Sequence, residues 1–138
     1  MWLNLVEKSI TVKSIFKDET VSLDSIVLNR IEIRCDSGWN TLVGFYLSQY
    51  PSNPPEKWKK QQYDTVRLGL SFSENEILYF QNSNFTLSKG NLTITEEGVY
   101  KKIIFAEPEN NLPIFIFRCK WIFVSSISAC LHEEEENY

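Results

Sequence analysis

The chain has 138 residues, and 14 Lys and Arg stand against 18 Asp and Glu, which gives a formal net charge of -4. Four of these acids form one run near the C-terminus, at residues 133–136, and the rest of the chain carries as many bases as acids. Proteins that bind nucleic acid or an acidic membrane use an excess of Lys and Arg, because phosphate contacts supply much of their affinity. Composition therefore argues against both partners, and the length predicts one domain.

The residue types favour β structure. Aromatic residues make up 14% of the chain and isoleucine is abundant, whereas alanine, the strongest helix former, occurs only at Ala106 and Ala129. Side chains that are aromatic or branched at Cβ fit a pleated, half-buried surface. We therefore predict a mainly β protein.

The cysteines and the N-terminal residues bear on the compartment. Cys35, Cys119 and Cys130 are odd in number and lack a C-x-x-C spacing, which predicts reduced thiols and a cytoplasmic protein. Charged Glu7 and Lys8 stand where an export signal needs an apolar run, and no apolar stretch approaches the roughly 18 residues of a membrane span. We expect a soluble protein with no export signal.

The N-terminal segment, residues 2–16, is ambiguous between helix and strand. Trp2, Val6 and Ile10 have helical spacing, but the apolar positions then drift toward another phase. We predict a short helix here.

A hairpin is predicted next. Apolar residues alternate with charged ones over 31–35, which is typical of a strand with one solvated face. The turn Asp36-Ser37-Gly38 then leads into a second strand over 39–47.

Residues 48–62 are predicted to be one long irregular stretch, because three prolines remove backbone donors. The clearest pattern follows: Val66, Leu68, Leu70 and Phe72 alternate with small or polar residues, which predicts a strand buried on one face.

The second half of the chain predicts short strands separated by polar turns, at 77–80, 85–87, 92–95, 99–105, 114–117 and 121–127. The last two are nearly continuous apolar runs, typical of strands covered on both faces. About nine short strands predict a single-domain antiparallel β-sandwich or a strongly bent sheet over residues 1–131. We expect residues 132–138 to form an acidic, flexible tail.

The sequence contains few candidates for catalytic residues. The only histidine, His132, lies two residues after Cys130 near the C-terminus, where nothing fixes the geometry of a nucleophile and a base. One histidine without clustered cysteines makes a zinc site improbable, and the glycines form no phosphate loop. We predict no enzyme activity, no metal and no cofactor.

Two surface features could bind a partner. Lys57-Trp58-Lys59-Lys60 places one aromatic ring among three cations, which suits an acidic partner or a stacked base; alternatively, Trp58 folds back onto the core and the lysines keep the loop soluble. The glutamate run is either a lure for a basic partner or a solubilising tail.

Several segments resemble the bacterial Immunity protein 50 family over nearly the whole chain. They are Ser14-Ile15-Phe16, residues 23–34, the Asp36-Ser37-Gly38 turn, the Pro-x-x-Pro-Pro-x-Lys-Trp loop at 51–58, the strand at 63–72, and Phe117-Arg118-Cys119 with the apolar strand after it. The resemblance implies a non-enzymatic cytosolic protein of a polymorphic-toxin system, which protects the producing cell from a cognate toxin. It implies no catalytic residue.

For an immunity protein we expect aromatic anchors in the centre of the interface and charges at its rim. The predicted partner-binding residues are Tyr50, Lys57, Trp58, Lys59, Lys60 and Tyr63, with Glu133, Glu134, Glu135 and Glu136 as phosphate mimics if the toxin is a nuclease. The alternative function is a small-molecule or carbohydrate-binding β module, suggested by Trp39, Tyr46 and Trp58, although strand alternation makes these rings candidates for the core. Monomer and homodimer both stay open.

Overall fold

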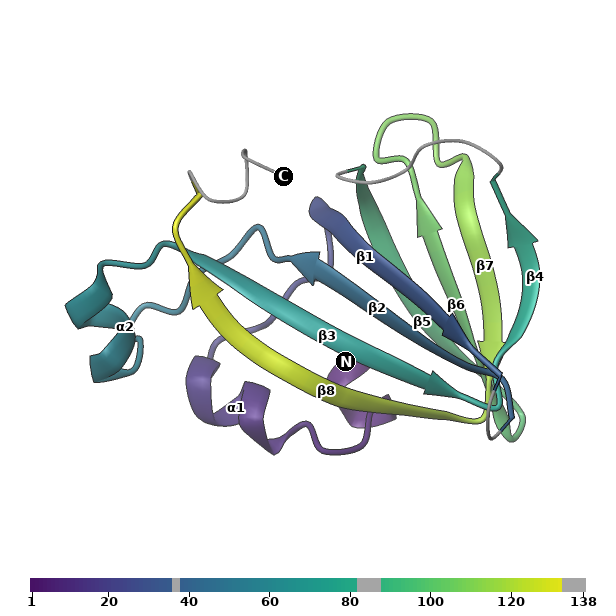
Figure 1. Ribbon diagram of the computed structural model, residues 1–138, viewed down its shortest axis with the longest axis horizontal. Helices are drawn as coiled ribbons and strands as arrows, with labels where there is room; N and C mark the ends of the chain where they lie inside the picture. The colour runs from purple at the N-terminus through teal and green to yellow at the C-terminus, as the bar shows by residue number, and fades with distance from the viewer. Residues whose placement is uncertain (36–37, 82–87, 133–138) are drawn as a thin grey trace.

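The computed structural model describes residues 1–35, 38–81 and 88–132. Within these ranges eight strands form one antiparallel sheet in the order β4-β7-β6-β5-β1-β2-β3-β8 (Figure 1). The elements are η1 (Trp2–Leu5), α1 (Ile10–Phe16), β1 (Ile26–Arg34), β2 (Asn40–Tyr46), α2 (Glu56–Gln61), β3 (Thr65–Ser73), β4 (Glu76–Phe80), β5 (Lys89–Glu97), β6 (Tyr100–Ala106), β7 (Pro113–Cys119) and β8 (Trp121–Cys130).

The sheet bends back on itself where β1 meets β5. These strands share only two residue pairs, Ile26 with Gly90 and Val27 with Lys89. Phe72 on β3 and Phe117 on β7 stand five strands apart, which is about 24 Å in a flat sheet. Their ring centroids are nevertheless 6.0 Å apart. The two halves of the sheet therefore face each other across the core, which confirms the mainly β prediction in its bent-sheet form.

The core lies between the halves and follows the predicted alternation. Val66, Leu68, Leu70 and Phe72 of β3 are fully buried. The rings of Phe105, Phe115 and Phe117 stack in a row on the opposite half. The alternating residues of β3 that point away from this core form the outer face of the sheet.

The N-terminal segment folds as two short pieces, η1 and α1, so the predicted helix is confirmed only in part. Val12 and Phe16 of α1 are buried one helical turn apart. Between the pieces the chain runs along the edge of β8, where Glu7 N–H donates to Ile122 and the carbonyl of Glu7 accepts from Val124.

Two predictions about local structure were wrong. Residues 56–61 form the helix α2: Pro55 precedes it, and its Glu, Lys and Gln residues are good helix formers. The strand β8 is not covered on both faces, because Ser125, Ser126 and Ser128 are exposed. It is also an edge strand of the sheet. The ninth predicted strand, at 85–87, lies outside the described residues, as do Asp36 and Ser37 of the first predicted turn.

The connections β1–β2, β3–β4, β5–β6 and β7–β8 all meet at one end of the molecule (Figure 1). We call this the hairpin end and define it as residues 33–35, 38–40, 73–77, 97–101 and 118–121. The helix α2 lies at the opposite end of the long axis.

Candidate protein-binding surfaces

We call α2, with Lys57, Lys59 and Lys60, the lysine helix. Two aromatic residues of the site predicted around it pack against the core. The rings of Tyr50 and Trp58 lie 6.1 Å apart between centroids and are tilted by 37°. Both side chains are partly buried and pack against the core cluster. Of the two interpretations given above for Trp58, the structure supports the one in which the ring folds back.

The lysines of this helix point to solvent. The amine of Lys59 donates to Asn53 Oδ1 at 3.0 Å and lies 3.8 Å from Glu56. Lys57 and Lys60 are exposed, and no carboxylate in the described part of the chain forms an ion pair with either. Tyr63 is half-buried just after the helix.

Burial also affects the tyrosine that supports Trp58. Removal from water, helped by the nearby charge of Asp64, raises the pKa of Tyr50. Its hydroxyl is buried and has no hydrogen-bond partner among the described residues. The structure thus brings Tyr50, Trp58 and the lysines together, whereas Glu133, Glu134, Glu135 and Glu136 lie outside the residues it describes.

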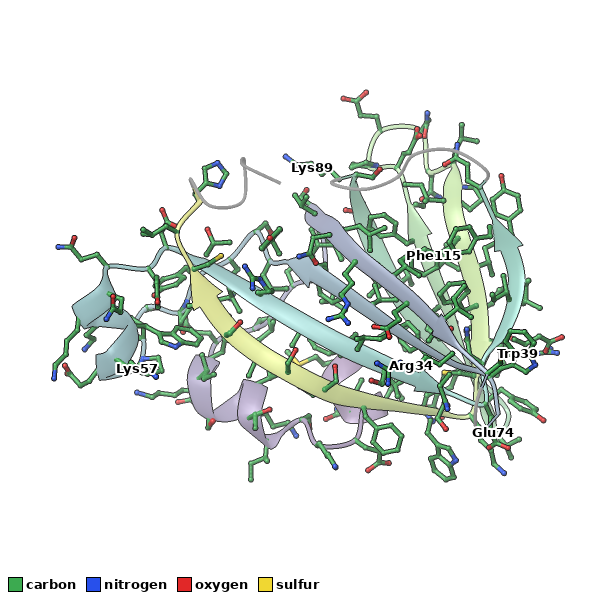
Figure 2. The ribbon with its side chains drawn as sticks, in the orientation of Figure 1. Arg34, Trp39, Lys57, Glu74, Lys89 and Phe115 are labelled. Atoms are coloured by element: carbon green, nitrogen blue, oxygen red, sulfur yellow. The ribbon has the colours of Figure 1, made fainter. Side chains whose placement is uncertain are left out.

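The hairpin end exposes more aromatic surface than the lysine helix. Trp39, Tyr100 and Trp121 are 58%, 44% and 43% exposed. Of the two interpretations given for Trp39, a core residue or an exposed ring, the structure supports the exposed ring, because β2 begins one residue later and Trp39 lies just before the strand (Figure 2). Tyr46, by contrast, is buried.

Cations surround these rings. Arg118 lies 5.4 Å from the ring centre of Tyr100, and Lys101 and Lys120 lie 5.9 and 5.8 Å from that of Trp121. Arg118 also donates two hydrogen bonds to Glu76, from Nε at 3.1 Å and from Nη2 at 2.6 Å. Trp, Tyr and Arg are the residues that most often carry the binding energy of protein interfaces.

A further charge cluster borders this end along β1. Hydrogen bonds from Arg34 and Arg30 lower the pKa of Glu32. The cluster is exposed, so it contributes little to stability, but it keeps a fixed pattern of charge beside the exposed rings.

A cavity of about 340 Å³, which we call the Trp39 pocket, opens at the hairpin end between Trp39, Asn75, Glu76 and Ile77. Asn75 is only 6% exposed. Its backbone N–H donates to the Trp39 carbonyl and its Nδ2 to Thr41 Oγ1, both at 2.8 Å. Its Oδ1 is buried and has no partner among the described residues. Leaving such an acceptor unpaired costs about 1–3 kcal/mol.

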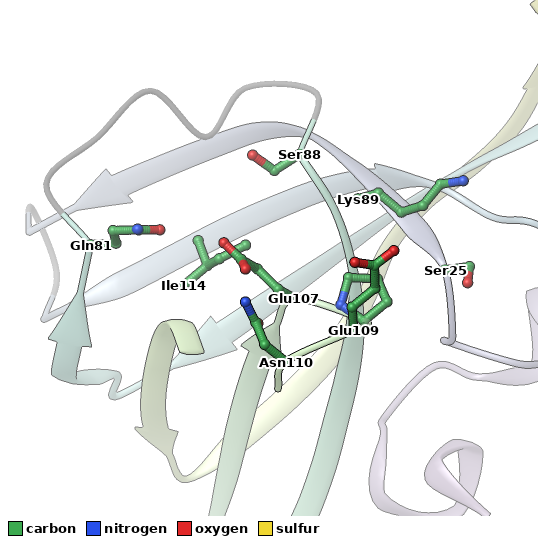
Figure 3. A pocket seen from close by; sticks show the side chains of 9 residues that line it. Ser25, Gln81, Ser88, Lys89, Glu107, Glu109, Asn110 and Ile114 are labelled. Atoms are coloured by element: carbon green, nitrogen blue, oxygen red, sulfur yellow. The ribbon is translucent and has the colours of Figure 1, made fainter. Parts of the chain in front are cut away.

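A second cavity, of about 500 Å³, lies at the ends of β4, β5, β6 and β7 that face away from the hairpin end (Figure 3). Polar side chains dominate its lining, including Lys89, Glu107, Glu109 and Asn110. None of its described lining residues is aromatic.

The cysteines and the histidine lie in different environments. Burial raises the pKa of Cys119 to about 12, so this thiol stays protonated at neutral pH. Cys130 is buried, whereas His132 is exposed and its backbone N–H donates to Asp64. Across residues 1–35, 38–81 and 88–132 no three His, Cys, Asp or Glu side chains gather as metal ligands, and no helix is long and apolar enough to cross a bilayer.

Sequence reasoning missed Tyr100 and Trp121 as surface residues. One signal was available for each, since Tyr100 follows the Glu96-Glu97-Gly98 turn and Trp121 stands beside charged Lys120. Aromatic residues at strand ends next to charges are exposed more easily than those in mid-strand.

Exposed aromatic rings edged by charges are typical of small domains that bind other proteins. The chain belongs to the Immunity protein 50 family, whose family model matches residues 8–130. No curated protein and no solved structure gave a significant match.

Proposed function

We propose that this immunity protein binds a cognate toxin of a bacterial polymorphic-toxin system and neutralises it by non-catalytic contact in the cytoplasm. The observation that carries the proposal is the family match over residues 8–130. The exposed rings of Trp39, Tyr100 and Trp121 support it, because an inhibitor needs a surface with anchors for tight binding.

Neutralisation by binding requires affinity rather than chemistry. A complex with a dissociation constant of about 1 nM has a binding free energy of about -12 kcal/mol. A few aromatic anchors in a water-free centre can supply much of that, while charges at the rim speed the encounter. The bound toxin is inactive as long as its active site or its substrate path stays covered.

Co-expression tests the proposal. A candidate toxin domain, taken from any toxin gene found beside this one, is produced in the cytoplasm with and without the immunity protein, and cell survival and complex formation are measured. We expect survival only with the immunity protein and a stable stoichiometric complex. Toxicity that persists while both proteins are soluble would reject the proposal, as would protection without any complex.

A further inference from the structure

We propose that the Trp39 pocket at the hairpin end binds a basic side chain, Arg or Lys, of the toxin. This inference rests on the proposed function for the identity of the partner. The chemistry of the pocket can be tested without the toxin.

The floor of the pocket provides an unused acceptor. Asn75 is more than nine-tenths buried, and its backbone N–H and Nδ2 are both bonded, which fixes the side chain in place. Only Oδ1 lacks a partner among the described residues. A donor brought in by a partner would restore the hydrogen bond that folding leaves unmade.

The wall of the pocket provides negative charge. Glu76 Oε2 accepts both hydrogen bonds from Arg118, and no described donor bonds to Oε1. Glu74, the residue before Asn75, is exposed and adds a negative charge to the hairpin end. The four lining residues include a carboxylate and an amide but no cation. Arg118 offsets part of the Glu76 charge, but Glu76 Oε1 and Asn75 Oδ1 remain as acceptors for a positively charged donor.

The remaining lining suits the stem of a basic residue. Trp39 and Ile77 are apolar, and long basic side chains bury their stems on such surface. An indole face also attracts a cation directly. The hairpin end already has three contacts between a cation and a ring: Lys101 and Lys120 at Trp121, and Arg118 at Tyr100.

A donor reaches Asn75 Oδ1 only after a group that covers this oxygen moves. The oxygen is closed off from solvent in the free protein. The Trp39 side chain is the most exposed ring of the hairpin end and lies outside the strand, so few contacts hold it. Because Trp39 lines the same pocket as Asn75, a shift of its ring would widen the access of a guanidinium or an ammonium group to the floor.

The first test uses N-acetyl-arginine amide as the probe and the neutral isostere N-acetyl-citrulline amide as the control. Both are titrated into the ¹⁵N-labelled full chain, and the indole N–H of Trp39 and the side-chain amide of Asn75 are followed by NMR. We expect saturable shifts at millimolar arginine probe and at least fivefold weaker binding of the citrulline probe. Glu76→Gln should weaken the arginine probe to the citrulline level. Equal binding of the two probes, or shifts confined to other residues, would overturn the inference.

The second test uses the toxin domain. Trp39→Ala should weaken its binding at least about 30-fold, as expected for an interface anchor, with thermal unfolding unchanged. The matched control, Lys57→Ala with Lys60→Ala at the opposite end, should change affinity less than threefold. The reverse order of effects would refute the pocket while leaving the proposed function intact. If the unmodified chain does not bind the toxin, the proposed function fails, and the arginine probe decides the pocket independently.

Discussion

The lysine helix and the hairpin end both combine tryptophan with cations, yet the structure uses the two tryptophans differently. Trp58 lies against Tyr50 and the core, so its ring is part of the folded body and only the lysines face water. Trp39 lies beyond the end of β2 with 58% of its surface exposed (Figure 2). An aromatic residue among charges is therefore available to a partner only where no core surface lies within its reach.

The largest expected effect is a loss of stability at Trp58 without a loss of toxin affinity. Trp58→Ala removes partly buried surface from the core, and we expect a loss of about 2–3 kcal/mol in the free energy of unfolding. Toxin affinity of the folded protein should stay within threefold. Urea denaturation and calorimetric titration measure the two quantities. Unchanged stability with lost affinity would make Trp58 the anchor and reverse the comparison.

The next effect is a loss of toxin affinity when a bulky label is attached to Cys35 at the hairpin end. Cys35 is exposed directly after β1, whereas Cys119 and Cys130 are buried and the pKa of Cys119 is about 12. A polyethylene-glycol maleimide at neutral pH should therefore modify Cys35 selectively. We expect the bulky label to weaken toxin binding at least tenfold, and a small iodoacetamide label to change it little.

A label at the other end is the matched control. In a Cys35→Ser background, Lys60→Cys places the same maleimide on the lysine helix, and affinity should be unchanged. If that label blocks the toxin while the one on Cys35 does not, the binding surface lies at the lysine helix.

Much of the fold could be predicted from the sequence because the alternation is local. The pattern from Val66 to Phe72 identified β3 and its buried face without any tertiary information. Position within the sheet could not be predicted in this way. The apolar run of β8 indicated burial on both faces, but topology places it at an edge, where a bulge opposite Gly69 and Leu70 also changes the phase of its side chains.

The candidate surfaces were less predictable, since exposure depends on where a strand ends. Trp39 continues the alternation of β2, which made it a candidate for the core, but the ladder begins at Asn40. The position of Asn75, and with it the unpaired oxygen, is fixed by hydrogen bonds to Trp39 and Thr41, which are more than 30 residues away in sequence. Only the folded chain shows that these residues meet.

A smaller effect is expected when Asn75 of the Trp39 pocket loses its hydrogen bond to Thr41. Thr41→Val keeps the shape of the side chain but removes the acceptor of Asn75 Nδ2, and a buried unpaired donor should lower the free energy of unfolding by about 1–2 kcal/mol. Because Asn75 also loses its fixed orientation, binding of the arginine probe should weaken several-fold. Denaturation and NMR titration measure the two changes. If the variant loses the expected stability but binds the arginine probe as tightly as the unmodified chain, Asn75 does not take part in binding the probe.

The smallest expected effect concerns the charges of the lysine helix. Reversing both exposed charges with Lys57→Glu and Lys60→Glu should change the free energy of unfolding by less than about 0.5 kcal/mol, because no described carboxylate is lost as a partner. These charges can still influence how fast a charged toxin arrives, and rim charges act mainly on the association rate. Stopped-flow association at low and high salt distinguishes steering of the toxin from direct contact with it. Salt screens charges that act over a distance, so a change in association rate that occurs only at low salt indicates steering. A tenfold loss of affinity that persists in high salt would require direct contact, and the lysine helix would then share the interface with the hairpin end.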